Sequence, residues 1–311
     1  MRVLVTGGAG FIGANLCRAL SEADGIDGVA AYDNLSSGFA ENLTGTEADL
    51  IEADLLDLDA LRDAIRGCGA VVHLGARPSV PRSIEDPLAS HHANVTGTLN
   101  VFEAARLEDV DQVVIASSSS VYGANPIMPK IETMLPDPLS PYAASKLAGE
   151  AYARSYAHSF GRPNLVFRFF NVFGRLQAAG HAYAAVVPAF LDAAMNDRPL
   201  QLNGDGSTSR DFTHVSTVTA VIVDALQRGV TSPEPVNLAF GTRTTLRELI
   251  ALIEDLLGTT VEVNELPERA GDVRHSQADS TSLQRLFPDV KPIELRDALE
   301  DTIDWFREAS S

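Results

Sequence analysis

A glycine-rich turn between an apolar run and an amphipathic segment constrains this chain more than any other feature. It reads Thr6-Gly7-Gly8-Ala9-Gly10-Phe11-Ile12-Gly13. The run at 3–5 predicts a buried strand and the segment 14–23 predicts a helix. Glycines at such a junction let the backbone turn, approach a pyrophosphate and bring the helix close to the strand, and the helix start offers free N–H groups to the phosphates. A tight turn without a ligand is the alternative interpretation.

Asp33 favours the dinucleotide interpretation. It comes twenty residues after Gly13, at the end of a second apolar run, 29–32. A carboxylate at this position meets the ribose hydroxyls of the adenosine half of a dinucleotide. It also repels an additional phosphate, so NAD is expected rather than NADP. The alternative is a solvated aspartate in a turn.

Apolar runs alternate with helical patterns through the first half of the chain. This alternation predicts an α/β fold with a doubly wound parallel sheet of the Rossmann type, covered on both faces. Further strands are predicted at 49–51, 70–73, 112–116, 165–169 and 236–238. Helices are predicted at 57–65, 86–107, 141–160, 184–196, 216–228, 245–257 and 295–309.

The pattern changes after about residue 170, where the loops 174–183 and 203–211 are long and rich in glycine or polar residues. We therefore expect two domains. A dinucleotide-binding domain takes residues 1–170, with 212–240 crossing back into it. A smaller, mixed α/β substrate domain takes 171–211 and 241–311.

Composition excludes several classes of protein. The chain has 311 residues, of which 45% are hydrophobic, and a net charge of −18. Nucleic acid is an unexpected partner because its phosphates would be repelled. No apolar run approaches the about 20 residues of a membrane span. Because the chain opens on a strand and has only Cys17 and Cys68 as cysteines, we expect no signal peptide, no disulfide framework and a cytoplasmic location.

Tyr142 and Lys146 lie one helical turn apart at the start of the helix predicted after Pro141, so they share a face. A tyrosine ordinarily loses its proton near pH ~10. A lysine cation, together with a positive nicotinamide ring, favours the phenolate and makes the tyrosine a general base. Ser118 belongs to a run of four serines after the strand 112–116 and can relay a proton. An exposed helical pair and a polar capping turn are the alternatives.

Taken together, the glycine loop, Asp33, Ser118, Tyr142 and Lys146 resemble the extended short-chain dehydrogenase/reductase family. Over nearly its whole length the chain is similar to nucleotide-sugar 4-epimerases of the UDP-glucose and UDP-N-acetylglucosamine type. Further matching stretches are Asp54-Leu55, His73-Leu74-Gly75-Ala76, Ser79-Val80-Pro81-Arg82-Ser83-Ile84, Phe169-Phe170-Asn171-Val172-Phe173-Gly174, Arg210-Asp211-Phe212 and Arg269-Ala270-Gly271-Asp272.

The resemblance implies roles for particular residues. Tyr142 is the catalytic base, Lys146 holds the nicotinamide ribose, and Ser118 contacts the sugar. The implied NAD-binding residues are Gly7, Gly10, Phe11, Ile12, Gly13, Asp33, Asn34, Ser36, Gly38, Asp54, Leu55, Leu74, Gly75, Ala76, Asn94, Tyr142, Lys146 and Phe170. The implied substrate-binding residues are Ser79, Ser118, Tyr142, Asn171, Ala185, Val186, Gln201, Asn203, Arg210, Arg269, Asp272 and Ser276.

The implied reaction inverts carbon 4 of a UDP-hexose through a transient 4-keto sugar, with NAD as the bound cofactor. Related dehydratases carry an Asp-Glu pair where this chain has Ser119 and Ser120, which argues against removal of water. Ser276 replaces a bulky tyrosine found in some relatives, so N-acetylated sugars are expected to fit. The loop at Arg175 departs from the family pattern. A nucleotide-sugar 4-ketoreductase, another sugar-modifying enzyme and a non-catalytic NAD-binding regulator remain open.

Two further expectations concern partners. The family forms homodimers, which predicts a dimer through the helices at 86–107 and 141–160. The adjacent His91 and His92 diverge on a helix, and no ligand pattern accompanies them, so no metal is expected.

Overall fold

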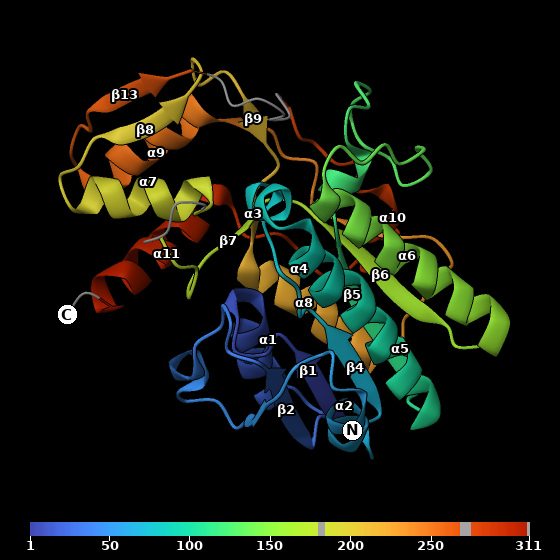
Figure 1. Ribbon diagram of the computed structural model, residues 1–311. Coiled ribbons are helices and arrows are strands. Elements are labelled where there is room, and N and C mark those ends of the chain that lie inside the picture. Colours follow the sequence, from blue (N-terminus) through green and yellow to red (C-terminus); the bar gives the residue numbers. More distant parts are fainter. Residues whose placement is uncertain (180–183, 268–274, 310–311) are drawn as a thin grey trace.

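The computed structural model describes residues 1–179, 184–267 and 275–309. Within these ranges, the core is a seven-stranded sheet in the order β11-β6-β5-β4-β1-β2-β3, and every neighbouring pair is parallel (Figure 1). The strands are β1 Arg2–Thr6, β2 Gly28–Asp33, β3 Asp49–Glu52, β4 Ala70–His73, β5 Gln112–Ser118, β6 Asn164–Phe169 and β11 Val236–Leu238. The predicted doubly wound sheet is confirmed, and the strand predicted at 236–238 joins it.

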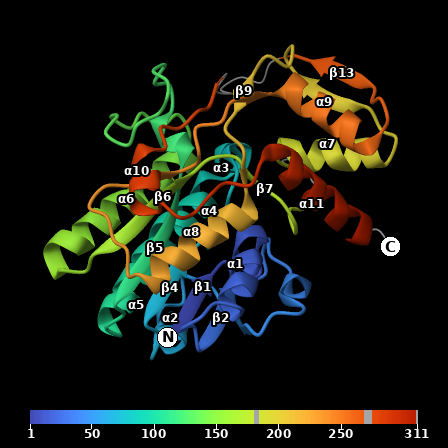
Figure 2. The same ribbon diagram turned by 180° about the vertical axis from the view of Figure 1, so that it is seen from behind.

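Helices cover both faces of the sheet, as the apolar strands require. The helices α1 (Phe11–Ser21), α8 (Val215–Gln227) and α10 (Thr281–Leu286) lie on one face, which Figure 2 shows from behind. The helices α2 (Leu58–Ile65), α5 (Gly97–Leu107) and α6 (Pro141–Phe160) lie on the other. In β1, Val3 and Val5 face the first helical layer and Leu4 faces the second, because side chains of a strand alternate.

A third apolar core lies beyond the sheet. Its elements are α7 (Val186–Met195), β8 (Leu200–Asn203), α9 (Leu246–Leu257), β13 (Val263–Leu266) and α11 (Leu295–Ala309). β8 and β13 form a parallel pair. Two short ladders connect this region to the sheet, β7 (Val172–Phe173) with β10 (Thr213–His214), and β9 (Ser209–Arg210) with β12 (Thr244–Thr245). Leu283 and Phe287, although late in the chain, pack in the core of the main sheet.

Most predicted bounds agree with the structure to within a few residues, and those of β4, β11, α6 and α11 coincide with it. The helix predicted at 14–23 starts earlier, at Phe11, and β5 runs two residues further, to Ser118. The very short strands β7, β9, β10 and β12 carry no sequence periodicity, so they were not predicted.

The continuous helix expected over 86–107 is wrong. The chain instead forms α3 (Val80–Glu85), α4 (Pro87–His91), a five-residue π-helix (His92–Thr96) and then α5. Pro81 and Pro87 each start a short helix, because proline is tolerated in the first turn. The π-helix widens the backbone at Asn94, whose side chain is buried and bonded to a neighbouring segment.

Because all strands of the main sheet are parallel, their carboxyl ends meet at one edge. The lobe built from α7, β8, α9, β13 and α11 lies beside that edge, together with α3 (Figure 1). This edge is therefore where the predicted site residues can gather. None of the helices in the described parts of the chain combines the length and apolar character needed to cross a membrane.

Candidate active site

The glycine loop joins β1 to α1 as the sequence predicts. Gly7 has φ +68, and a Cβ there would lie 2.7 Å from the amide nitrogen of Gly75. A Cβ on Gly13 would lie 2.0 Å from the carbonyl oxygen of Gly7, so only glycine lets α1 start this close to the strand. Gly10 precedes α1, and Phe11 and Ile12 form its first turn, where the described residues offer no side-chain cap. The loop thus leaves helix N–H groups and an open backbone for an anion.

Asp33 ends β2 beside this loop, as predicted. Its carboxylate accepts hydrogen bonds from the backbone N–H of Ala9 (3.0 Å) and Leu35 (2.9 Å). Gly38 passes so close that a Cβ would lie 3.0 Å from the Asp33 carboxylate. Next to it, the Asn34 amide donates to Asp54 (2.7 Å). The remaining predicted residue of this group, Ser36, donates its N–H to Asn34 (3.1 Å).

The end of β4 closes the other side of the loop. The N–H of Leu74 bonds to the carbonyl of Thr6, and the N–H of Gly75 bonds to the hydroxyl of Thr6 (3.2 Å). Leu55 lies against Gly75, where a Cβ would be 3.0 Å from its methyl group. Ala76 follows directly in the chain. Leu74, Gly75, Ala76 and Leu55 therefore border the glycine loop, as expected for residues along a cofactor.

His73 is a buried group at this edge, and no sequence pattern indicates its role. Its Nδ1 lies 2.6 Å from the Thr6 hydroxyl and its Nε2 lies 2.9 Å from the Thr98 hydroxyl. Thr98 donates its own proton to the carbonyl of Asn94 (2.6 Å), so it must accept from Nε2–H of His73. Burial and the Lys146 charge lower the pKa of His73 to about 3. A neutral imidazole thus ties β1, β4 and α5 together.

Asn94, predicted near the cofactor, makes three hydrogen bonds within the protein. Its carbonyl oxygen accepts from the N–H of Arg77 (2.7 Å), and its amide group donates to the carbonyl of Arg77 (3.1 Å) and to the Ser145 hydroxyl (3.0 Å). Both amide protons are used, and the side chain is buried. Asn94 therefore joins the segment after β4 to the helix that carries Tyr142, and its place beside the cofactor stays a prediction.

Ser118, Tyr142 and Lys146 meet at the end of β5, as predicted. Ser118 is the last residue of the strand, and its hydroxyl oxygen accepts from the N–H and the hydroxyl of Ser120 (3.2 and 2.9 Å). A hydrogen bond from Ser118 reaches the Tyr142 phenol. Lys146 lies one turn further along α6 and donates from Nζ to the carbonyl of Ala116 (2.8 Å). The end of β5 and the first turns of α6 thus hold these three side chains close together.

The expected lowering of the Tyr142 pKa is not found. Burial raises the pKa of the phenol, and the hydrogen bond from Ser118 only partly opposes this. Burial lowers the pKa of Lys146 to about 8, so its ammonium group is still charged at neutral pH. Burial, which the sequence pattern does not display, disfavours the charged form of both groups.

The four consecutive serines do not share one role. Ser117 lies within β5 and donates its hydroxyl to Glu150 of α6, away from Tyr142. Glu150 also forms a bidentate ion pair with Arg168 of β6, with N–O distances of 2.9 and 2.7 Å, and both side chains are buried. Ser119 and Ser120 begin a short 3₁₀ turn. Alternation along the strand therefore leaves Ser118, but not Ser117, at the site.

The predicted substrate residues come from both lobes. Asn171 donates its amide to the carbonyl of Asp211 (3.2 Å), and Arg210 lies on β9, paired with Thr244. Ser276 is half-buried and is held beside β9 by its N–H bond to Ser209 (3.0 Å). The other members are Ser79 at the start of α3, Ala185 and Val186 at the start of α7, and Gln201 and Asn203 on β8. Phe170, predicted for the cofactor, is buried and follows β6. Arg269 and Asp272 lie outside the described residues.

Arg175, in the loop that departs from the family pattern, is committed to the other lobe. Its guanidinium pairs with Asp301 of α11 (2.9 Å), and its carbonyl accepts from Asn15 of α1 (2.9 Å). The residue thus links α1 to α11. Its side chain is bonded to protein groups rather than turned toward the site.

The cysteines and the possible metal ligands were also the subject of sequence predictions. Cys17 and Cys68 are free and buried, as predicted. Among the residues that the structure describes, no group of three histidine, cysteine or acidic side chains is arranged to hold a metal ion. His91 and His92 contact each other edge to face, with 5.8 Å between their ring centroids.

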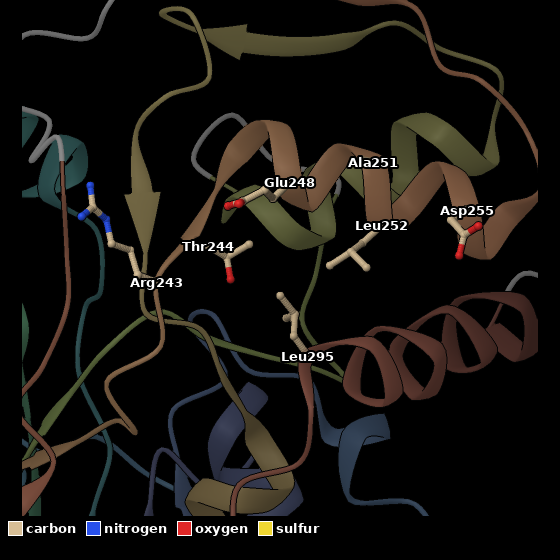
Figure 3. Close-up of a pocket in the computed structure, with 7 residues that line it drawn as sticks. All are labelled: Arg243, Thr244, Glu248, Ala251, Leu252, Asp255 and Leu295. Atoms are coloured by element: carbon tan, nitrogen blue, oxygen red, sulfur yellow. The ribbon is translucent and has the colours of Figure 1, made fainter.

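A cavity of about 500 Å³ lies away from these residues, between α9 and the start of α11. It is lined by Arg243, Thr244, Glu248, Ala251, Leu252, Asp255 and Leu295. Figure 3 shows the guanidinium of Arg243 turned away from the other lining side chains. None of the predicted site residues lines this cavity, although Thr244 pairs with Arg210. We do not assign it to the reaction.

The fold and the site define a dinucleotide-binding protein with a Ser–Tyr–Lys set at the carboxyl edge of its sheet. Residues 3–239 match the model of the NAD dependent epimerase/dehydratase family. The chain belongs to this family.

Three relatives illustrate how closely the chain matches it. A UDP-glucose 4-epimerase of Mycolicibacterium smegmatis is 38% identical, with all of both chains covered. The structure of a UDP-N-acetylglucosamine 4-epimerase from Methanobrevibacter ruminantium in complex with UDP-N-acetylmuramic acid has a TM-score of 0.93 at 37% identity, covering 99% of this chain and 98% of that one. The Thermus thermophilus UDP-glucose 4-epimerase in complex with NAD has a TM-score of 0.90 at 35% identity, covering 99% and 100%.

Proposed function

We propose that this chain is an NAD-dependent epimerase that inverts carbon 4 of a UDP-hexose. The observation that carries the proposal is the meeting of Ser118, Tyr142 and Lys146 at the sheet edge that also holds the glycine loop. The epimerase names of its relatives support it. A cradle at Gly7 and Gly13 that a Cβ would fill, with Asp33 beside it, fits the pyrophosphate and ribose of NAD.

In the proposed reaction, Tyr142 takes the proton of the sugar's 4-hydroxyl, and Ser118 hydrogen-bonds at the phenol. NAD, when bound, would supply reversible hydride exchange with carbon 4. Once the transient 4-keto sugar has turned over about its UDP end, carbon 4 would take the hydride back on its opposite face, and Tyr142 returns the proton to the 4-oxygen. Lys146, charged at neutral pH, offers a cation beside the phenolate and donors for the nicotinamide ribose. The buried surroundings exclude water from the ketone.

We assign the UDP end of the substrate to Asn171 and Arg210, together with Arg269 and Asp272. Two arginines suit a dianionic diphosphate in a chain whose net charge is −18. Ser79, Ala185, Val186, Gln201, Asn203 and Ser276 complete the proposed substrate set, and the proposed NAD set is the one predicted from the sequence. The small side chain of Ser276 leaves room for an N-acetyl group, so we propose UDP-N-acetylglucosamine and UDP-N-acetylgalactosamine beside UDP-glucose and UDP-galactose.

We also propose a homodimer through the layer formed by α3, α4, α5 and α6. Large apolar side chains are exposed on each of these helices: Ile84, Leu88, Leu107 and Phe160. A partner that covers them would remove this apolar surface from water. The two-domain division remains a proposal as well, with residues 1–170 and 212–240 around the sheet. The segment of α10 packs in that same core, so it belongs with the sheet rather than with the rest of 241–311. The free cysteines suit a reducing cytoplasm, which we propose as the compartment.

The test is product analysis with a panel of UDP-, TDP- and GDP-sugars and no added NADH. We expect interconversion of the 4-epimers of UDP-hexoses, N-acetylated ones included. Tyr142→Phe should lower kcat by about 10²- to 10⁴-fold, because a general base is lost, while NAD stays bound. No exchange at carbon 4 of any UDP-hexose would refute the proposal.

A nucleotide-sugar 4-ketoreductase is the second candidate, because the same Ser–Tyr–Lys set also serves ketone reduction. Net consumption of NADH distinguishes it, since an epimerase returns the hydride to the sugar and consumes none. A non-catalytic NAD-binding regulator would show neither exchange nor consumption.

A further inference from the structure

The backbone of Tyr142 is held by a side chain from another helix. Tyr142 is the second residue of α6, where backbone N–H groups have no partner within the helix. Its N–H donates to the hydroxyl oxygen of Ser83 on α3 (3.0 Å). The Ser83 hydroxyl in turn donates to the carbonyl of Val80 (2.7 Å), which fixes its rotamer. Ser83 is fully buried.

Ser83 completes the cap of α6. Pro141, the first residue, has no N–H, and Ser140 accepts the next two donors after Tyr142: the N–H of Ala143 at its hydroxyl (3.1 Å) and the N–H of Ala144 at its carbonyl (2.9 Å). The N–H of Tyr142 is therefore the one donor of this turn that depends on a distant segment. Without Ser83 the N–H of Tyr142 would lose this hydrogen-bond partner.

The carbonyl of Tyr142 is restrained as well. It accepts from the Ser145 hydroxyl (2.7 Å), and Ser145 is bonded to Asn94 (3.0 Å), which clamps the backbone of Arg77. The segment from Arg77 to Ser83 is thus joined to both sides of the Tyr142 residue. We propose that Ser83 is a positioning residue, which holds the backbone of Tyr142 so that its phenol meets Ser118. This proposal rests on the proposed function of Tyr142 as the base.

The chain offers a matched control. Ser90 on α4 is also buried, and within the described part of the chain its hydroxyl has no hydrogen-bond partner. Ser83→Ala and Ser90→Ala therefore remove the same atom from buried positions in the same layer of helices. Only the first substitution breaks a bond to Tyr142.

For both variants, kcat and KM are measured with the UDP-hexose that the wild-type enzyme interconverts best. Amide proton exchange is measured on the same variants in a separate experiment. Small misplacement of a catalytic group lowers the rate strongly, so we expect Ser83→Ala to lower kcat by about 10- to 100-fold with little change in KM. Amide proton exchange at Tyr142 should become faster. Ser90→Ala should match the wild type in all three.

Equal kcat and equal Tyr142 amide exchange in Ser83→Ala and Ser90→Ala would overturn the proposal. If Ser83→Ala does not fold, Ser83→Cys keeps a weaker acceptor at the same place: a reduced kcat at unchanged KM supports the proposal, and a wild-type kcat contradicts it. The exchange measurement does not depend on activity. An inactive wild type would therefore count against the proposed function, while faster exchange in Ser83→Ala would still support the contact.

Discussion

Asp211 is a fully buried residue at the junction of the two lobes, and neutral groups donate hydrogen bonds to its carboxylate. It accepts from the N–H of Gly241 (3.1 Å) and Ala278 (3.0 Å) and from the Thr242 hydroxyl (2.9 Å). Burial outweighs these donors and raises its pKa to about 6. The residue holds Arg210, its neighbour in the chain, next to the segment that contains Ser276.

The raised pKa of Asp211 predicts that the stability of the folded protein depends on pH. Between pH about 3.8, its ordinary value, and about 6, the folded state binds more protons than the unfolded state. The cost of its charge is fully present above pH 6 and is relieved as the pH falls toward 3.8. The effect of Asp211→Asn, which removes that charge, on stability should be more favourable at pH 7 than at pH 4 by about 2–3 kcal/mol.

Chemical denaturation between pH 4 and pH 7 checks this. Asp205 is a control of opposite sign, because hydrogen bonds from Ser207 lower its pKa. The effect of Asp205→Asn should therefore be a loss of stability that persists from pH 7 to pH 4, because this stabilisation is lost only below pH about 3.8. A stability difference for Asp211→Asn that is independent of pH would contradict the argument.

Gly13 is the residue on which the close approach of α1 depends. Gly13→Ala places a methyl group 2.0 Å from the Gly7 carbonyl oxygen, whereas Gly10→Ala places one at 3.2 Å. We expect Gly13→Ala to destabilise the fold by about 3 kcal/mol and to abolish NAD retention, because helix and loop must separate. Gly10→Ala should be the milder of the two. Thermal unfolding and the NAD content of the purified variants measure both effects.

At the scale of elements, α6 is fixed to the sheet through its buried Glu150. The carboxylate pairs with Arg168 of β6 and accepts from Ser117 of β5, and the Arg168 guanidinium lies 4.7 Å from the centroid of the Tyr122 ring. Tyr142, Lys146 and Glu150 follow one another at intervals of four residues, so they share a helix face. The ion pair therefore sets which face of α6 meets the end of β5.

Removing one partner of this buried pair leaves the other charge without compensation. Glu150→Ala should cost about 3–5 kcal/mol of stability. The double variant Glu150→Leu/Arg168→Met should cost less than the sum of its single variants. Arg154, on the same helix, pairs with Glu234 at the surface, so Arg154→Ala should change stability by at most about 1 kcal/mol. Equal losses for Glu150→Ala and Arg154→Ala would show that burial does not matter here.

At the scale of the whole molecule, the proposed dimer predicts that a charge introduced into the layer of α3, α4, α5 and α6 prevents dimerisation. Leu88 on α4 is 70% exposed, and Ile293, which is 43% exposed, bonds through its N–H to Thr217 of α8 on the opposite face of the sheet. Leu88→Glu should give a monomer, because it would bury an unpaired charge in the interface. Ile293→Glu should leave the molecular mass in solution equal to that of the wild-type dimer. Light scattering on the eluting protein reads the oligomeric state, and a wild-type monomer would contradict the dimer.

The sequence by itself determined the sheet, the order of its main elements and the residues at the strand ends. Apolar runs, helical periodicity, glycines and Pro141 act locally, so they can be recognised along the chain. The position of Ser118, Tyr142 and Lys146 follows from these, because carboxyl ends of parallel strands converge on one edge.

Only the tertiary structure decided the rest. It divided the helix expected over 86–107, used the amide of Asn94 within the protein and turned Arg175 toward α11. It also raised the pKa of Tyr142 and placed Ser83 against its backbone. These features depend on burial and on partners far apart in the chain, and neither has a periodicity or spacing that the sequence displays.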